Sequence, residues 1–415
     1  MRPSLAHYNP TVHPRLLLVV FCPFAAGYFL SYFFRNVNAV IARDLAGEFA
    51  LSSADLGFLT SMYLLAFAAF QLPLGVLLDR YGPRRVVAAL MCIAGAGALV
   101  FGLAQDFVTL SVGRALIGLG VSGGLMGAIK AFSLWFPLSR LATLNGLYLA
   151  VGGLGGLSAT APVEALLGPF GWRALFYGLA AASVGAAALI FLVVPEKALP
   201  GHGQSLRTQV AGFGRIFASV PFWRIALPMV VGHSAYQALQ GLWLAPWLYD
   251  VAALPRAAVA NGLLAAAIAY TAGSVFFGVS SDRLARAGVS RLAVFKAGMA
   301  LSLGMFVLLA AGVTSALPAI LVVYGFTVVS AALAYALLTP LFPPEFTGRV
   351  NTASNVMMFT LSFLFQWGIG AVLRLYPSLD GRYAPEGYAA AFWILAALQA
   401  AVIAWLLPMR SRASA

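Results

Sequence analysis

The feature that most constrains this chain is a series of long apolar runs, each about as long as a bilayer is thick. About 20 apolar residues in a helix span the hydrocarbon core. Such runs recur throughout the 415 residues, separated by short stretches that carry charges, Gly and Pro. The twelve predicted membrane-spanning helices lie near 16–41, 56–78, 84–104, 108–134, 141–165, 172–194, 223–249, 257–280, 291–313, 316–340, 350–375 and 388–407.

Composition excludes most other classes of protein. Only 9% of the residues are charged and 62% are hydrophobic, whereas a soluble domain carries about 25% charged residues. The chain therefore cannot build the surface of a soluble enzyme or a nucleic-acid-binding domain, and its partner is the lipid bilayer. The two cysteines, Cys22 and Cys92, lie inside apolar runs and predict neither a disulfide framework nor a metal cluster. We expect no enzyme activity, no cofactor and, without a phosphate-binding loop, no ATP-driven pump.

Basic residues mark the orientation of the chain in the membrane. If the N-terminus is cytoplasmic, sixteen Lys and Arg fall in loops and termini on that side and only five on the other. Positive residues concentrate in cytoplasmic loops, so we predict a multi-pass protein of the inner (plasma) membrane with both termini inside. The net charge of +13 is mainly this topology signal and requires no nucleic-acid partner.

The chain repeats itself once. Segment 75–80, Gly-Val-Leu-Leu-Asp-Arg, recurs as 278–283, Gly-Val-Ser-Ser-Asp-Arg, 203 residues later, and Phe136-Pro137 recurs as Phe342-Pro343 at an offset of 206. Several matches at nearly one offset indicate a duplicated six-helix unit. The predicted domains are an N-terminal six-helix bundle over 1–194, a cytoplasmic linker over 195–222 and a C-terminal six-helix bundle over 223–415.

A compact motif of small and charged residues joins the second and third predicted spans. A glycine permits a tight turn or a close helix approach, and a carboxylate such as Asp79 can pair with a helix N-terminus or an arginine. The motif therefore predicts a charge latch that breaks when the two halves move; the alternative is a basic loop that only sets topology. The motif reads Gly75-x-x-x-Asp79-Arg80-x-Gly82-x-Arg84-Arg85.

This motif resembles the signature of the major facilitator superfamily at every defining position, and the resemblance covers essentially the whole chain. It implies an all-α membrane protein with twelve transmembrane helices in two pseudo-symmetric six-helix bundles, which rock about a central substrate site. Asp282 and Arg283 stand at the second copy of the motif, which lacks the second glycine in register.

Arg114 belongs to a second motif, Arg114-x-x-x-Gly118-x-Gly120, which is similar to another element of the same family. An arginine inside a span is costly unless it is paired or faces water. The resemblance implies a cavity residue linked to coupling. A hydrogen-bond partner of backbone carbonyls is the equally open alternative.

Two polar stripes predict where a substrate binds. Tyr28, Tyr32 and Arg35 follow i, i+4, i+7 spacing on the first span, which places them on one helical face. The same spacing recurs on the seventh span 205 residues later, so the stripes occupy equivalent positions in two halves. In the resembled fold these helices line the cavity, together with the fourth and tenth. The predicted substrate-binding residues are Tyr28, Tyr32, Arg35, Asn38, Lys130, His233, Tyr236, Gln237 and Gln240.

Arg35 predicts the charge of the substrate. Every acidic residue lies in a loop or near the end of a predicted span, and an unpaired cation in a water-filled cavity favours an anion held by a guanidinium fork. The alternative is an arginine bonded to carbonyls.

The stretch around Arg35 also resembles the anion:cation symporter branch, whose members often carry an Asp-Arg pair here, but this chain has Phe34. Without that aspartate, His233 is the candidate carrier of a coupling proton. The alternative is that His233 is a hydrogen-bonding core residue. Lys130 either contacts the anion at an inner gate or extends to the interface.

These observations predict a secondary active transporter that moves a small organic anion, a carboxylate or phosphorylated metabolite, by alternating access. We expect it to act as a monomer, driven by a proton or ion gradient or by exchange. The alternatives are an exporter of drugs or metabolites with the same fold and, less favoured, a transporter-like sensor. An exporter of lipophilic cations would need a membrane-embedded carboxylate, whereas the acidic residues of this chain lie in loops or near the ends of the predicted spans.

Overall fold

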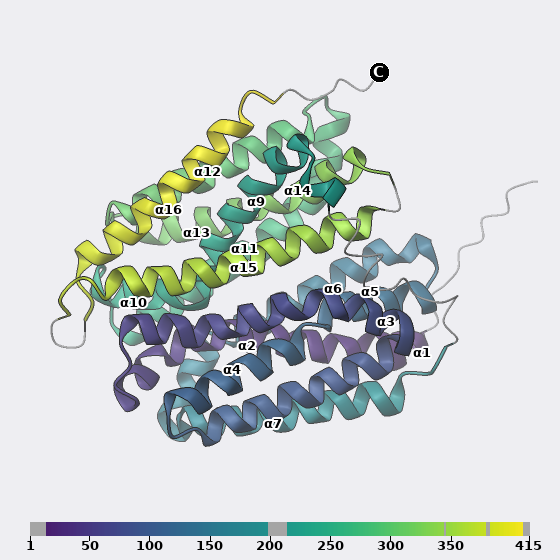
Figure 1. The fold of residues 1–415 in the computed structure, drawn as a ribbon, viewed down its shortest axis with the longest axis horizontal. Helices are drawn as coiled ribbons and strands as arrows, with labels where there is room; N and C mark the ends of the chain where they lie inside the picture. Colours follow the sequence, from purple (N-terminus) through teal and green to yellow (C-terminus); the bar gives the residue numbers. More distant parts are fainter. Residues whose placement is uncertain (1–13, 198–213, 344–345, 379–381, 410–415) are drawn as a thin grey trace, which may run out of the picture.

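The computed structural model describes residues 14–197, 214–343, 346–378 and 382–409, and these are helical apart from short connections. In Figure 1 the helices lie side by side and run mostly along the longest axis of the molecule. The elements are α1 (Pro14–Leu16), η1 (Leu17–Phe21), α2 (Cys22–Glu48), α3 (Ser53–Leu103), α4 (Phe107–Val121), α5 (Gly124–Trp135), α6 (Leu138–Ser158), α7 (Ala161–Val193), α9 (Val220–Ala238), η2 (Leu239–Trp243), α10 (Leu244–Asp250), α11 (Arg256–Arg286), α12 (Arg291–Ala310), α13 (Leu317–Val328), η3 (Val329–Ala332), α14 (Leu333–Leu338), η4 (Thr339–Leu341), α15 (Thr347–Leu373) and α16 (Pro385–Leu406).

The helices form two bundles that follow each other in the sequence. Figure 1 shows the purple and blue helices up to α7 below and the green and yellow helices from α9 onward above. We call the end at which α1 begins and α16 finishes the terminal end, and the opposite end, where α10 stops at Asp250, the loop end. The predicted fold class, two bundles of membrane-spanning helices, is confirmed. The predicted linker over 195–222 lies largely outside the described residues.

Nine segments of the described chain are long and apolar enough to cross a membrane, and no strand interrupts them. One of these segments, α3, is 51 residues long and contains both the second and the third predicted spans. The fifth and seventh predicted spans correspond to α6 and to the run α9, η2 and α10. The helices therefore account for all twelve predicted spans.

Local sequence determines where α3 begins and where it turns back. Its first turn is capped by Ser52, whose Oγ accepts a hydrogen bond from the Asp55 backbone N–H while the Asp55 carboxylate accepts one from the Ser52 N–H. Gly82 has φ of 80° and ψ of 159°, which breaks the helix. A residue with a Cβ adopts this positive φ only at a cost. Pro83 follows at the first turn of the next helix, where its missing N–H is not needed.

The boundary between the fifth and sixth predicted spans was wrong. The prediction placed the fifth span at 141–165, but α6 ends at Ser158 and a new helix begins at Ala161 with Pro162 in its first turn. That helix bends again at Gly171, where φ is 72°. Apolar character continues across the break between Ser158 and Ala161, so hydropathy could not locate it, whereas the bend at Gly171 coincides with the predicted start of the sixth span at 172.

Two short segments depart from α geometry in the middle of the C-terminal bundle. η2 is a π-helical turn over Leu239–Trp243, and η3 is a 3-10 turn over Val329–Ala332. All five residues of η2 are buried. Such turns rotate the helix that follows them and are frequent at functional sites.

Glycines allow the helices to approach each other closely. A Cβ added to Gly118 in α4 would lie 2.1 Å from the carbonyl oxygen of Tyr63 in α3, and one added to Gly155 in α6 would lie 2.1 Å from that of Phe29 in α2. Small residues at such contacts provide van der Waals packing where no hydrophobic effect acts between helices.

We predict that Gly118→Ala lowers the free energy of unfolding by about 1–3 kcal/mol, because α3 and α4 must separate to admit the methyl group. Thermal unfolding of the detergent-purified protein measures the effect. The matched control is Gly178→Ala in α7, where an added Cβ would meet nothing within 4 Å. Equal melting temperatures for the two variants would contradict the close contact.

Candidate functional site

Two adjoining cavities lie between the bundles near the middle of the molecule. Their volumes are about 170 and 60 Å³. Tyr32 and Arg35 from α2 line both, as do His233 from α9 and Tyr270 from α11. Because each cavity takes residues from both halves, a molecule bound here contacts both moving parts of the protein.

Arg35 is the only residue with a formal charge among the described residues that line these cavities. It makes no ion pair with a described residue, and its buried Nε has no hydrogen-bond partner. The guanidinium carbon lies 4.7 Å from the ring centroid of Tyr32, 5.6 Å from that of Phe67 and 5.1 Å from that of Phe359. Ring faces attract a cation but do not neutralise it, so the cavity keeps a positive charge.

The wall opposite α2 is polar and largely unsatisfied. Both side-chain amide atoms of Gln237 are buried without a partner, and so is Oε1 of Gln240. The Gln240 Nε2 donates to the backbone oxygen of Leu263 at 3.3 Å. η2 begins directly after this stretch of α9 and places Gln240 and Gly241 in the cavity lining. Unpaired buried amides are costly without a bound partner.

The structure brings most of the predicted substrate-binding residues together. Aromatic contacts order both stripes: Tyr28 stacks on Tyr148 at 4.3 Å between ring centroids, and Tyr236 stacks on Tyr270 at 5.1 Å. The predicted residues that line the two cavities are Tyr28, Tyr32, Arg35, His233, Tyr236, Gln237 and Gln240.

Two predicted residues lie elsewhere. Asn38 is fully buried and donates from Nδ2 to Thr60 Oγ1 of α3 at 3.2 Å, on a face of α2 that does not line either cavity. Lys130 forms an ion pair with Asp79 and lines neither cavity. Its ammonium group extends toward the terminal end of α5 and meets a carboxylate there, so we do not retain Lys130 as a substrate ligand.

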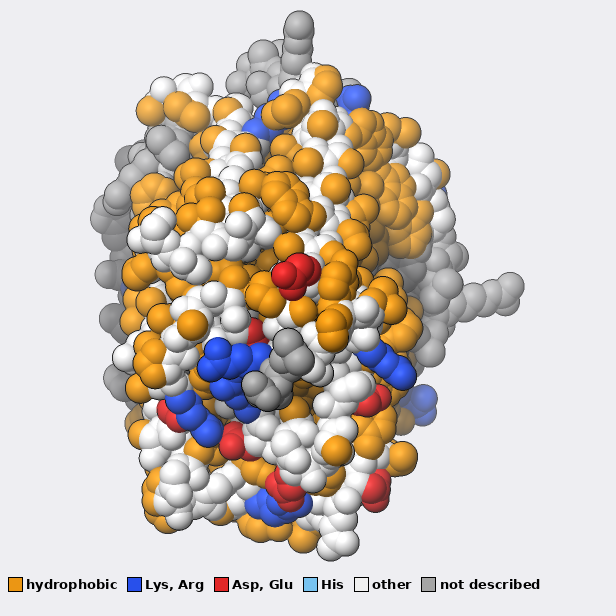
Figure 2. Space-filling model, turned by 90° about the vertical axis from the view of Figure 1, so that its left-hand side faces the viewer, with side chains coloured by type: hydrophobic (Ala, Val, Ile, Leu, Met, Phe, Trp, Pro, Cys, Tyr) orange, Lys and Arg blue, Asp and Glu red, His pale blue; other side chains and the backbone are white. Residues whose placement is uncertain are grey.

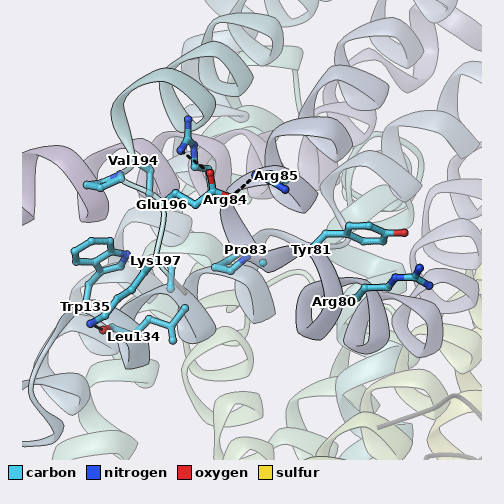
Figure 3. A pocket seen from close by; sticks show the side chains of 13 residues that line it. Arg80, Tyr81, Pro83, Arg84, Arg85, Leu134, Trp135, Val194, Glu196 and Lys197 are labelled. Carbon is cyan, nitrogen blue, oxygen red and sulfur yellow. Dashed lines mark hydrogen bonds and ion pairs between the residues drawn. The ribbon is translucent and has the colours of Figure 1, made fainter. Parts of the chain in front are cut away.

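The predicted charge latch is built within the N-terminal bundle. Asp79 of α3 pairs with Lys130 of α5, while Arg84 and Arg85 pair with Glu196 at 3.6 and 2.5 Å. Figure 3 shows Glu196 between these arginines, beside a cavity of about 220 Å³. In this conformation the latch joins helices of one bundle and does not bridge the two bundles.

The remaining gating residues differ in how they are placed. Gly75 lies in α3 ahead of the turn at Gly82, and Arg80 lies with its guanidinium 5.2 Å from the Tyr81 ring. Figure 3 shows Arg80 pointing away from Glu196. The side chains of Asp282 and Arg283, on α11, lie outside the described residues.

Arg114 is a buried structural residue in this conformation. It is 1% exposed, donates from Nη1 to the backbone oxygen of Phe34 at 3.1 Å and lies 5.2 Å from the Tyr63 ring. It lines neither central cavity. Of the two alternatives left open by the sequence, this geometry supports the hydrogen-bond partner of a backbone carbonyl.

Several cavity residues escaped sequence reasoning. Tyr270 stands on α11, a helix not expected to line the site, and Tyr335 donates to Asn355 Oδ1 at 2.5 Å across the terminal-end side of the larger cavity. Gln71 reaches the same cavity from α3. Isolated polar residues such as these carry no periodic signal, so only the packing of the helices brings them into the site.

Ion pairs between described residues join the two bundles at the loop end. Arg43 pairs with Asp250 at 3.0 Å, and Arg256 pairs with Asp44 at 3.0 Å and with Glu164 at 2.6 Å. Figure 2 shows basic and acidic side chains gathered together on this face, with hydrophobic side chains around them. These pairs hold the loop end closed.

The backbone reinforces this closure. The Ser53 Oγ of α3 donates to the carbonyl oxygen of Gly370 in α15 at 2.9 Å. A Cβ on Gly370 would lie 2.3 Å from the Ser53 carbonyl oxygen, so only glycine permits the contact.

Asp250 is the most enclosed member of the loop-end ion pairs. Its side chain is 3% exposed and accepts hydrogen bonds from the Tyr388 hydroxyl at 2.7 Å and the Tyr383 N–H at 3.3 Å. Burial raises the pKa of this carboxyl, although those hydrogen bonds and the charge of Arg43 act in the opposite direction. Asp250 therefore loses its charge at a higher pH than an exposed aspartate would, and Arg43 then loses its carboxylate partner.

Two pseudo-symmetric helical bundles around a central polar cavity define a membrane transporter. A family model described as Major Facilitator Superfamily matches residues 24–366. The chain belongs to that superfamily.

The chain is also similar in sequence and in fold to known transporters. The chain is 30% identical over 158 residues to the probable sulfoacetate transporter SauU of Cupriavidus necator, covering 38% of this chain and 37% of that protein. It is 34% identical over 194 residues to the efflux pump aflT of Aspergillus parasiticus, covering 45% and 35%. The matches thus span about a third of the length of these relatives. The fold resembles a bacterial homologue of the human lysosomal transporter Spinster in an inward-facing and occupied conformation, with a TM-score of 0.69, 17% identity and 94% of both chains covered.

We predict that Asp250→Asn opens the loop end more often, because it removes the buried charge that holds Arg43. A cysteine in place of Ser53, which is 3% exposed between α3 and α15, should then react several-fold faster with a membrane-impermeant maleimide. The background carries Cys22→Ser and Cys92→Ser.

The matched control is Arg173→Gln, which breaks the pair with Glu48 inside the N-terminal bundle at the same end. It should leave the labelling rate of the cysteine unchanged. Equal acceleration by Asp250→Asn and Arg173→Gln would mean that the ion pair between the bundles is not what keeps the loop end closed.

Proposed function

We propose that this protein is a secondary active transporter that moves a small organic anion, a carboxylate or a phosphorylated metabolite, across the inner membrane. The observation that carries the proposal is Arg35, the sole formal charge among the described lining of the central cavities, which has no carboxylate partner. An intramembrane charge of this kind is costly unless it is solvated or paired. A substrate anion supplies the missing partner.

The geometry around Arg35 suits an oxyanion. A guanidinium offers donors in a planar fork that matches the two oxygens of a carboxylate or phosphate. The unpartnered Nε of Arg35 supplies one such donor. The aromatic faces of Tyr32, Phe67 and Phe359 surround the guanidinium and limit its exposure to water, which strengthens an ion pair formed there.

The opposite wall receives the rest of the substrate. Gln237 and Gln240 offer unpartnered amide atoms, so the substrate carries hydroxyl or other hydrogen-bonding groups beside its anionic group. The relative named as a probable sulfoacetate transporter supports an anionic substrate, because sulfoacetate carries a carboxylate and a sulfonate.

Transport proceeds by alternating access between the two bundles. With both termini cytoplasmic, the loop end faces outward and is closed here by Arg43, Asp250 and Arg256. The larger cavity extends from Arg35 toward Tyr335 and the terminal end. A proton or ion gradient, or exchange, supplies the energy, and His233 is the histidine that lines both cavities with Arg35.

The test is binding of organic anions to purified protein with and without the guanidinium. In a thermal-shift panel of monocarboxylates, sugar phosphates and cationic dyes, we expect anions to stabilise the wild type. Arg35→Gln should weaken binding about 10- to 100-fold, since hydrogen bonds to a charged group contribute about 1.5–3 kcal/mol. Arg35→Lys retains the charge without the fork and should fall between. Arg15→Gln, at the exposed terminal end, is the control.

Equal stabilisation of the wild type and Arg35→Gln by every anion would reject Arg35 as the anion ligand. Stabilisation by cationic dyes alone would instead favour an exporter, the activity for which the relative aflT is named. Uptake of a stabilising anion into proteoliposomes, with and without a pH gradient, then separates transport from sensing and tests for proton coupling.

A further inference from the structure

A further, larger cavity lies between the two bundles at the loop end. Its volume is about 660 Å³. We call it the loop-end vestibule. It is bounded by the ends of α2 and α3 from one bundle and of α10 and α15 from the other. It shares no lining residue with the two central cavities. Its charged and hydroxyl-bearing lining residues are Arg43, Ser52, Ser53, Asp250, Arg374, Tyr376, Ser378, Arg382 and Tyr383.

The described lining of the vestibule has a surplus of positive charge. It includes three arginines, Arg43, Arg374 and Arg382, but only one carboxylate, that of Asp250. That carboxylate is already occupied, because it accepts hydrogen bonds from Arg43, the Tyr388 hydroxyl and the Tyr383 N–H. Arg374 and Arg382 are exposed and form no ion pair with a described residue.

Four acids of the loop end are already held by other groups. Asp44 and Glu164 both pair with Arg256, and Glu48 pairs with Arg173. The Asp55 carboxylate caps α3 through Ser52. Glu386 at the start of α16 and Asp106 before α4 form no ion pair with a described residue, so the positive surplus belongs to the vestibule lining and not to the loop end as a whole.

Arg43 connects the vestibule to the closure of the loop end. Its side chain is 44% exposed, its guanidinium carbon lies 3.6 Å from the Tyr249 ring centroid, and its Nη2 lies 3.0 Å from Asp250. An anion in the vestibule can share this guanidinium with Asp250 and so weaken one of the links between the bundles.

We propose that the loop-end vestibule is a second anion-binding site, which takes a soluble oxyanion with more than one negative charge on Arg43, Arg374 and Arg382. One guanidinium group can bind both oxygens of a carboxylate. The arginines of the concave vestibule lining also attract anions electrostatically before the anions enter the cavity. Anion binding in the vestibule does not depend on the function proposed above. Only a role in delivering anions to the central cavity rests on that proposed function.

The experiment is calorimetric titration of citrate into the full chain in uncharged detergent, at low ionic strength where screening is weak. Citrate should bind the wild type. The double variant Arg374→Gln/Arg382→Gln should lose the vestibule component of citrate binding, with affinity there about tenfold or more weaker, whereas Arg35→Gln should retain that component, because the vestibule and the central cavity share no residue. A matched double variant, Arg15→Gln/Arg215→Gln, removes two exposed arginines at the terminal end and should also bind normally. Unfolding temperatures establish that each variant is folded.

Three results would overturn the proposal: no citrate binding to the wild type, unchanged binding to Arg374→Gln/Arg382→Gln, or equal loss in the control Arg15→Gln/Arg215→Gln. Displacement of citrate by phosphatidylglycerol in the micelle would identify a lipid headgroup as the ligand and reject a soluble anion. If Arg35→Gln abolishes monocarboxylate binding but not citrate binding, both sites stand. If Arg35→Gln changes neither, the proposed function fails while the vestibule remains.

Discussion

The hydrocarbon core of a bilayer provides no hydrogen-bond partners for the backbone, and the rest of this structure depends on that constraint. Nearly every described residue is helical, because a helix satisfies its own N–H and C=O groups. Two departures from α geometry in the C-terminal bundle lie where protein surrounds them or where a cavity borders them. η2 is fully buried, and residues of η3 line the larger central cavity. These two turns lie next to the site, whereas η1 and η4, which are mostly not buried, lie outside its lining.

The same constraint makes the surroundings of each intramembrane arginine decisive for its role. Arg114 and Arg35 are arginines on neighbouring helices, yet their surroundings differ. Arg114 donates from Nη1 to the Phe34 carbonyl oxygen and has almost no exposed surface, so it links α4 to α2, although its Nε also lacks a partner among the described residues. Arg35 has aromatic faces but no carboxylate partner among the described residues and borders both cavities. Of the two residues, only Arg35 presents its positive charge to a cavity in which a ligand can bind.

Helical spacing predicted much of the candidate site and failed for identifiable reasons. Tyr28, Tyr32 and Arg35 share one face of α2, as do His233 and Gln237 on α9, so periodicity could find them. Asn38 follows Arg35 by three residues, but that step turns it toward Thr60 of α3. Lys130 has a long side chain that reaches Asp79. A spacing rule gives a face, whereas the direction of a flexible side chain depends on the partner it meets.

The sequence by itself determined the twelve spans, the internal repeat, the turn at Gly82 and the two polar stripes, because each depends on composition or on spacing within one helix. Only the tertiary structure decided which charges meet. Arg43 and Asp250 are 207 residues apart in the chain, and Arg374 joins Arg43 at the vestibule from the other bundle. Such meetings depend on how the helices rotate and tilt against one another. Hydrophobic periodicity does not encode those rotations, since lipid and protein interior are equally apolar neighbours for most of the side chains.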